Sequence, residues 1–162
     1  MTLPGPPVRL FLAVAALSLG VVAAALFTQH AMGMLPCPWC VLQRLIFVAI
    51  AAFALLGAAV SGRAVQRVIA WLMLLAALAG AAAALWQHFV AASSTSCKLT
   101  LADRVMSATG LDALLPDVFA AWATCADAAV KLWGLPYEAW SLAVFLLIAV
   151  AAVRLLRLPA SR

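Results

Sequence analysis

The sequence predicts an all-α membrane protein, a four-transmembrane-helix antiparallel bundle with two extracytoplasmic loops. Apolar residues make up 69% of the 162 positions and charged residues only 9%. Soluble domains are roughly half apolar and about a quarter charged, so the composition disfavours a water-soluble fold. Four stretches are apolar enough to cross a bilayer, and short connections favour antiparallel neighbours. We expect a single transmembrane domain over residues 1–162.

Each predicted span is a run of about 20 residues rich in Ala, Leu and Val, which is the length that a bilayer requires. The spans cover approximately residues 8–27, 41–60, 68–90 and 139–156. Within the first span, Ala23-Ala24-Ala25 resembles the cleavage site of a signal peptide. The apolar run is longer than the about 7–15 residues of a signal h-region, so we interpret it as a span.

Basic residues mark the predicted cytoplasmic side, because cytoplasmic segments of membrane proteins keep an excess of Lys and Arg. They lie in the turn 61–67 and toward the two chain ends, at Arg9, Arg63, Arg67, Arg154, Arg157 and Arg162. All five acidic residues precede the fourth span, at Asp103, Asp112, Asp117, Asp127 and Glu138. Both termini are therefore expected in the cytoplasm, and the loops 28–40 and 91–138 on the periplasmic side.

The formal charge of +5 does not predict a nucleic-acid partner. Nucleic-acid surfaces gather basic residues into patches, whereas here they are scattered singly and no run of them is interleaved with aromatic residues. We interpret them as topology signals of a protein embedded in a lipid bilayer.

The second loop carries an apolar stripe opposite Asp112 and Asp117. The stripe recurs at helical spacing and consists of Leu111, Leu114, Leu115, Val118, Phe119 and Trp122. This pattern predicts a short amphipathic helix on the membrane surface. Pro116 divides it into two pieces, the second of which should begin near Pro116. Packing of the same stripe against the bundle explains the pattern equally well.

The predicted topology places all four cysteines on the side where disulfides persist. Cys37 and Cys40 have the two-residue spacing of dithiol redox motifs. Cys40 also lies where the second span begins, and the positive end of a helix dipole favours the thiolate. The same spacing is half of a zinc site, but a zinc site of four cysteines would leave no reactive thiol. We therefore predict no metal; Cys97 and Cys125 are compatible with a redox or a structural disulfide.

Arg44 is a basic residue within a predicted span, where hydropathy alone does not predict a charge. It lies one helical turn below Cys40 on the same face, so its guanidinium can approach the Cys40 sulfur or a ligand beside it. An Arg at mid-bilayer costs about 2.5–3.5 kcal/mol on insertion scales, a cost usually associated with function. The alternative is that Arg44 snorkels to the lipid headgroups.

The sequence resembles one enzyme family along its four spans. The matching residues are Pro36-Cys37-Pro38-Trp39-Cys40-Val41-Leu42-Gln43-Arg44, then Cys97 and Cys125, then Trp133-Gly134-Leu135-Pro136-Tyr137-Glu138-Ala139-Trp140-Ser141-Leu142. They resemble the disulfide bond formation protein B (DsbB) family, bacterial inner-membrane thiol:quinone oxidoreductases. The resemblance implies an enzyme that reoxidises a periplasmic thioredoxin-like dithiol oxidase of the DsbA kind.

Carried over by position, the resemblance implies disulfides Cys37–Cys40 and Cys97–Cys125. The partner would attack Cys97, and the released Cys125 would exchange with the Cys37–Cys40 disulfide. Cys40 would then be the thiolate that reduces a membrane quinone, either ubiquinone or menaquinone. Arg44 would stabilise the developing negative charge.

The two histidines are weaker candidates. His88 lies near the end of the third span at the membrane level of Arg44, so we carry it as a possible hydrogen-bond partner of a quinone oxygen. A lone histidine at an interface is more often a polar anchor, and His30 is best explained in that way.

Two other interpretations compete with this one. A protein like vitamin K epoxide reductase also joins a four-helix bundle, paired cysteines and a quinone, but its quinone-proximal pair belongs near the last span. A membrane scaffold with two structural disulfides would leave Arg44 and the Cys37–Cys40 motif as coincidences. Readiness to exchange with a thiol pool separates catalytic from structural disulfides.

Overall fold

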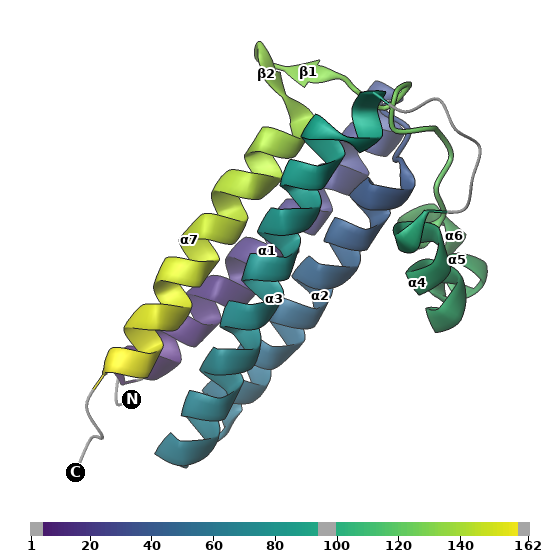
Figure 1. The fold of residues 1–162 in the computed structure, drawn as a ribbon. Coiled ribbons are helices and arrows are strands. Elements are labelled where there is room, and N and C mark those ends of the chain that lie inside the picture. The colour runs from purple at the N-terminus through teal and green to yellow at the C-terminus, as the bar shows by residue number, and fades with distance from the viewer. Residues whose placement is uncertain (1–4, 94–99, 159–162) are drawn as a thin grey trace.

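The computed structural model describes residues 5–93 and 100–158, in which four long helices form an antiparallel bundle (Figure 1). The four helices are α1 (Pro6–Met32), α2 (Pro38–Ala59), α3 (Arg63–Phe89) and α7 (Tyr137–Arg157). Each is long and apolar enough to cross a membrane. The predicted fold class is confirmed, and the chain is a multi-pass membrane protein.

Local capping chemistry, rather than hydropathy, sets the ends of these helices. α1 continues to Met32 because Gly33 adopts φ 67° and its backbone N–H donates to the Thr28 carbonyl. Glycine takes this left-handed conformation without steric cost. α2 begins at Pro38, a residue favoured at the first helical position, and the Cys37 sulfur caps it by accepting from the Cys40 N–H. The helix therefore starts earlier than the predicted span, and Cys40 lies in its first turn.

The two loops that carry the cysteines emerge at the same end of the bundle. The connection from α1 to α2 and the long connection from α3 to α7 both leave the bundle at the end opposite the N- and C-termini, and short helices of the second connection lie beside α2 (Figure 1). This shared end is the arrangement that the predicted topology required.

The second loop is more helical than predicted. α4 (Leu101–Thr109) was not expected from the sequence; a capping box between Thr100 and Asp103 begins it. The apolar stripe forms α5 (Leu111–Leu114) and α6 (Pro116–Phe119), so the predicted break at Pro116 is confirmed.

The apolar stripe is divided between buried and exposed positions; its packing on the bundle is confirmed, and its place on a membrane surface stays a prediction. Phe119 is buried against Val41 of α2 together with Met106 of α4. Leu114 and Leu115 are exposed. Trp122 is exposed and lies beyond the end of α6. The segment therefore packs on the bundle through one side and presents apolar side chains on the other.

A small hairpin leads into the last helix. β1 (Lys131–Leu132) pairs antiparallel with β2 (Leu135–Pro136). Trp133 and Gly134 at the turn have φ of 52° and 83°, as a tight two-residue hairpin turn requires. The Tyr137 N–H donates to the Val130 carbonyl, which joins the hairpin to the start of α7.

At the other end of the bundle, two polar side chains close helix C-termini. The Gln66 amide donates to the carbonyls of Gly57 and Val60 at the end of α2. The Arg63 guanidinium donates to the carbonyls of Leu155 and Leu158 at the end of α7. Terminal carbonyls have no partner within their own helix, and a cation is favourable at this end of the helix dipole.

Phenylalanine rings packed on glycines hold the middle of the bundle. Phe47 of α2 stacks on Phe145 of α7 with ring centroids 4.0 Å apart. The Phe145 ring also covers Gly80 of α3, where an added Cβ would lie 2.3 Å from it. Close approach of helices over small residues drives association where lipid is as apolar as the core.

Gly80→Ala should therefore destabilise the bundle. The new methyl group would overlap a fully buried ring, and overpacking typically costs about 1–3 kcal/mol. Gly20→Ala is the matched control, because nothing lies within 4 Å of a Cβ there. Thermal unfolding in detergent, followed by circular dichroism, should show a lower midpoint for Gly80→Ala and an equal or higher one for Gly20→Ala. Equal midpoints for both variants would contradict this account of the packing.

Candidate functional site

Three cysteine sulfurs meet at the N-terminus of α2. The Cys37 and Cys40 sulfurs lie 2.7 Å apart, and the Cys37 thiol is also hydrogen-bonded to Cys125 of the second loop. Cys37 and Cys125 are buried and Cys40 is partly buried, and all three are free thiols in this structure. The fourth candidate, Cys97, lies outside the described residues.

Backbone contacts between the two loops bring Cys125 to this position. The N–H groups of Trp122 and Ala123 both donate to the Pro36 carbonyl, directly before Cys37. Thr124 and Asp127 then hydrogen-bond to each other and close a turn around Cys125. Segments far apart in the sequence are thus joined beside the sulfurs.

The hydrogen bond between Cys37 and Cys125 affects the two thiols in opposite directions. Hydrogen bonds with Cys125 and Cys40, together with burial, raise the pKa of the Cys37 thiol far above its ordinary range. The hydrogen bond from Cys37 lowers the pKa of the Cys125 thiol, although burial opposes it. Of these two thiols, Cys125 is therefore the one whose thiolate form the contact favours, and the thiolate is the reactive form of cysteine.

Arg44 is turned into the protein rather than toward headgroups. Its side chain is only 6% exposed. Nη1 donates to Gln29 Oε1 at 2.6 Å and to the Val118 carbonyl at 3.1 Å, and Nη2 donates to the Ala25 carbonyl at 3.5 Å. Gln29 also donates to the Asp117 carbonyl. Arg44 and Gln29 thereby tie α1 and α2 to α6.

A cavity of about 300 Å³ lies beside these groups, between α1, α2 and α7 and next to the hairpin. Most of its lining is apolar, with residues such as Val22, Phe47 and Val144. Polar or ionisable side chains also line it: Thr28, Cys40, Gln43, Arg44, Gln87, Tyr137, Glu138 and Ser141. Apolar walls with a few convergent polar groups are typical of small-molecule sites.

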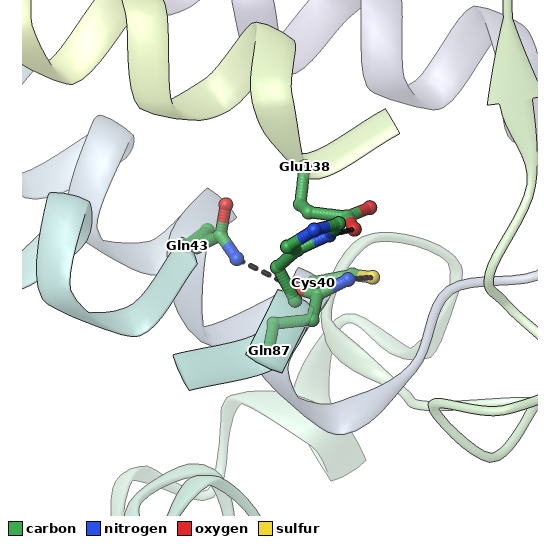
Figure 2. Close-up of polar contacts among 5 residues, drawn as sticks. Cys40, Gln43, Gln87 and Glu138 are labelled. Atoms are coloured by element: carbon green, nitrogen blue, oxygen red, sulfur yellow. Dashed lines mark hydrogen bonds and ion pairs between the residues drawn. The ribbon is translucent and has the colours of Figure 1, made fainter. Parts of the chain in front are cut away.

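Polar contacts of Gln87 and His88 connect this cavity to α3 (Figure 2). The Gln43 amide donates to Gln87 Oε1 at 2.7 Å, and the Gln87 amide donates to the Cys40 sulfur at 3.3 Å. Glu138, at the start of α7, is buried and contacts His88 Nδ1 at 2.7 Å. Cys40, Gln43, Gln87 and Glu138 come from three helices and surround one point (Figure 2).

The comparisons with known proteins agree with the cysteine arrangement. The family model "Disulfide bond formation protein DsbB" matches residues 7–155. This chain belongs to the DsbB family. It is accordingly a membrane oxidoreductase of disulfide bond formation, and the match along almost the whole chain sets aside both the vitamin K epoxide reductase and the scaffold interpretations.

Curated DsbB proteins of several bacteria are similar to the chain over most of their length. "Disulfide bond formation protein B 1" of Pseudomonas savastanoi pv. phaseolicola is 37% identical over 135 residues, covering 82% of this chain and 79% of that protein. The protein B of Herminiimonas arsenicoxydans is 37% identical, with coverages of 85% and 87%. That of Aromatoleum aromaticum is 36% identical, with coverages of 91% and 90%.

Within this DsbB fold, the predicted site residues are not all equally close to the cavity. Cys40 and Arg44 line it, while Cys37 and Cys125 lie next to Cys40. His88 is not among the lining residues; its ring is 45% exposed and reaches the site only through Glu138. Direct contact between His88 and a quinone stays a prediction.

Four polar residues of this DsbB protein had no role that could be predicted from the sequence. They are Gln29, Gln43, Gln87 and Glu138, and each is less than a tenth exposed. A signal for the three glutamines was present, because polar side chains within or at the ends of apolar spans commonly mark functional sites. Glu138 adjoins the predicted fourth span and gave no comparable signal.

Proposed function

We propose that this DsbB protein takes electrons from a periplasmic thioredoxin-like dithiol oxidase and passes them to a membrane quinone. The observation that carries the proposal is the meeting of Cys125, Cys37 and Cys40 beside a cavity that Arg44 also lines. Thiol exchange needs sulfurs in contact, and electron delivery needs the last sulfur next to the acceptor site.

The proposed relay begins at Cys97, whose role rests on the family resemblance. A partner thiolate attacks Cys97 Sγ in a Cys97–Cys125 disulfide, which forms a mixed disulfide and releases Cys125 as a thiolate. The second partner thiol then resolves the mixed disulfide, leaving the partner oxidised and Cys97 reduced. Two electrons have thereby entered the chain.

The next exchange uses the contact between Cys125 and Cys37. The Cys125 thiolate attacks Cys37 Sγ in a Cys37–Cys40 disulfide, so a Cys37–Cys125 bond forms and Cys40 leaves as a thiolate. Cys97 then attacks Cys125, which restores the Cys97–Cys125 disulfide and leaves Cys37 and Cys40 carrying the two electrons. The contact between Cys125 and Cys37 supports this exchange, because it places the attacking sulfur beside the sulfur that is attacked.

The cavity residues fit a quinone as the acceptor. A bound quinone accepts two electrons and two protons. Apolar walls would hold its ring, the Arg44 guanidinium would stabilise negative charge on a ring oxygen, and Cys40 lines the same space. Glu138 places a carboxyl group there, with His88 behind it.

The proposed location is the bacterial inner membrane, with both termini in the cytoplasm. Support comes from Arg63, Arg67, Arg154 and Arg157, which lie at the end of the bundle opposite the cysteines. The cysteine end would then face the periplasm, where a dithiol oxidase meets it and where disulfides persist.

A comparison of Cys97→Ser with Cys125→Ser tests the proposed order. Both variants should lose steady-state quinone reduction when the reduced partner supplies electrons. Only Cys125→Ser should form a covalent complex with the oxidised partner, seen on a non-reducing gel. This variant keeps the Cys97 sulfur, which attacks the partner disulfide, and lacks the Cys125 sulfur, which would displace the partner from Cys97. Parent rates in both variants would overturn the relay, and a complex with Cys97→Ser alone would reverse its order.

A further inference from the structure

Gln43 and Gln87 form an amide pair in the interior of the bundle that the proposed relay does not use. They project from facing helices, α2 and α3, and each is 3% exposed. An amide in apolar surroundings is costly unless it is hydrogen-bonded. The hydrogen bonds of the pair join the two glutamines to each other and Gln87 to the Cys40 sulfur, so the pair forms a short chain that ends on the sulfur.

The direction of this chain follows from its donors and acceptors. Gln43 uses an N–H to donate to Gln87 Oε1, which occupies the carbonyl end of the Gln87 amide. The remaining end of that amide is its NH₂ group, and it faces Cys40 Sγ (Figure 2). A flip of the Gln87 amide alone would set its NH₂ group against the NH₂ group of Gln43, so the donor from Gln43 favours this orientation of Gln87, and it is the orientation that a Cys40 thiolate requires.

We infer that Gln87 is a positioning residue that directs an N–H onto the Cys40 sulfur, and that Gln43 holds the Gln87 amide in that orientation. The inference rests on the proposed role of Cys40 as the sulfur that leaves Cys37 and faces the acceptor. A hydrogen bond donated to the charged form of a group favours that form. The amide therefore receives the negative sulfur as the Cys37–Cys40 bond breaks, and a more stable leaving thiolate is released faster.

The amide pair is one of several groups around Cys40, so an experiment has to hold the others constant. Cys37, at the cap of α2, contacts the Cys40 sulfur, and Cys125 of the second loop is hydrogen-bonded to Cys37. Arg44 of α2 and Glu138 of α7 line the same cavity, and His88 is paired with Glu138. A background with serine at 37, 97 and 125 leaves Cys40 as the sole cysteine. Serine is a favoured N-cap, so the start of α2 is retained.

Alkylation of Cys40 across a pH series, in the full chain purified in detergent, measures thiolate formation without any quinone turnover. In the single-cysteine background, Gln87→Leu should move the midpoint of the alkylation curve upward by about one pH unit, since a hydrogen bond to a charged group is removed. At neutral pH this is a roughly tenfold slower reaction. Gln43→Leu should produce a smaller shift in the same direction, because Gln87 keeps its N–H but loses its fixed orientation.

Gln66→Leu is the matched control. Gln66 is an equally buried glutamine at the opposite end of the bundle, where it caps α2. Its loss should leave the alkylation curve in place even if thermal stability falls. An unchanged curve in Gln87→Leu, or the same shift in Gln66→Leu, would overturn the inference.

The rate of quinone reduction by the same variants, with all four cysteines present, distinguishes a failure of this inference from a failure of the proposed relay. Slower quinone reduction by Gln87→Leu, together with a shifted alkylation curve, supports both. A shifted curve with parent turnover would show that the amide acts on Cys40 as inferred but that Cys40 is not the leaving sulfur, so the proposed function would fail instead.

Discussion

Cys40→Ser should abolish quinone reduction while leaving one oxidising equivalent available to the partner. In the proposed relay the variant keeps the Cys97–Cys125 disulfide, which would oxidise one partner dithiol by accepting two electrons. It lacks the sulfur that lines the cavity and that lies 2.7 Å from Cys37 Sγ, with which the proposed relay pairs it in a disulfide. Loss of a nucleophile that acts within a chain of groups lowers turnover by on the order of 10³-fold or more.

The measurement has two parts. Steady-state quinone absorbance should show no reduction above background, and rapid mixing with reduced partner should show a burst of one partner disulfide per protein. Serine is close in size and accepts a hydrogen bond from Gln87, so the fold should be retained. Cys97→Ser is the comparison, because it should show neither the burst nor turnover. Steady turnover by Cys40→Ser would remove Cys40 from the relay.

Arg44→Met should weaken quinone use far more than the reaction with the partner. Methionine keeps a long apolar stem but removes the charge and the hydrogen bonds that the guanidinium donates to Gln29, Val118 and Ala25. Stabilisation of developing charge in a site that excludes water is worth about 10²–10³-fold in rate for one donor. We therefore expect quinone reduction to fall by about 10²-fold, through a lower rate at saturating quinone.

The matched control is Arg63→Met. Arg63 lies at the opposite end of the bundle, where it donates to carbonyls at the end of α7. Its replacement removes the same charge and should lower thermal stability without changing the dependence of the rate on quinone concentration. Single-turnover oxidation of the partner should stay near the parent rate in both variants. If Arg44→Met reduced quinone with the same rate and concentration dependence as the parent, the role of Arg44 would be only to join α1 and α2 to α6.

Hydropathy and charge were enough to predict the four spans and the shared end of the two loops. These properties act residue by residue, since a bilayer selects about 20 apolar positions and retains basic residues on one side. The helix ends were predicted less well, because Gly33 and Cys37 act as caps through local geometry. α4 was missed for the same reason: a capping box at Thr100 begins it within a polar loop.

The spacing of Cys37, Cys40 and Arg44 along one helix could likewise be predicted, because positions three or four residues apart share a face. Gln43 lies at the same spacing from Cys40 but had no visible partner. Its contact, Gln87, comes from another helix, and no local pattern connects the two positions.

The sequence by itself therefore determined that the chain crosses a membrane four times and presents cysteines on one side of it. Only the tertiary structure decided that Cys125 lies on Cys37, that Arg44 faces α1 and α6, and that Glu138 separates His88 from the cavity. The physical reason is that lipid tails are as apolar as the interior of the bundle. Apolar residues consequently occur on every face of each span, so hydropathy does not show which face is buried. The rotation of a helix about its axis is set by contacts with its neighbours.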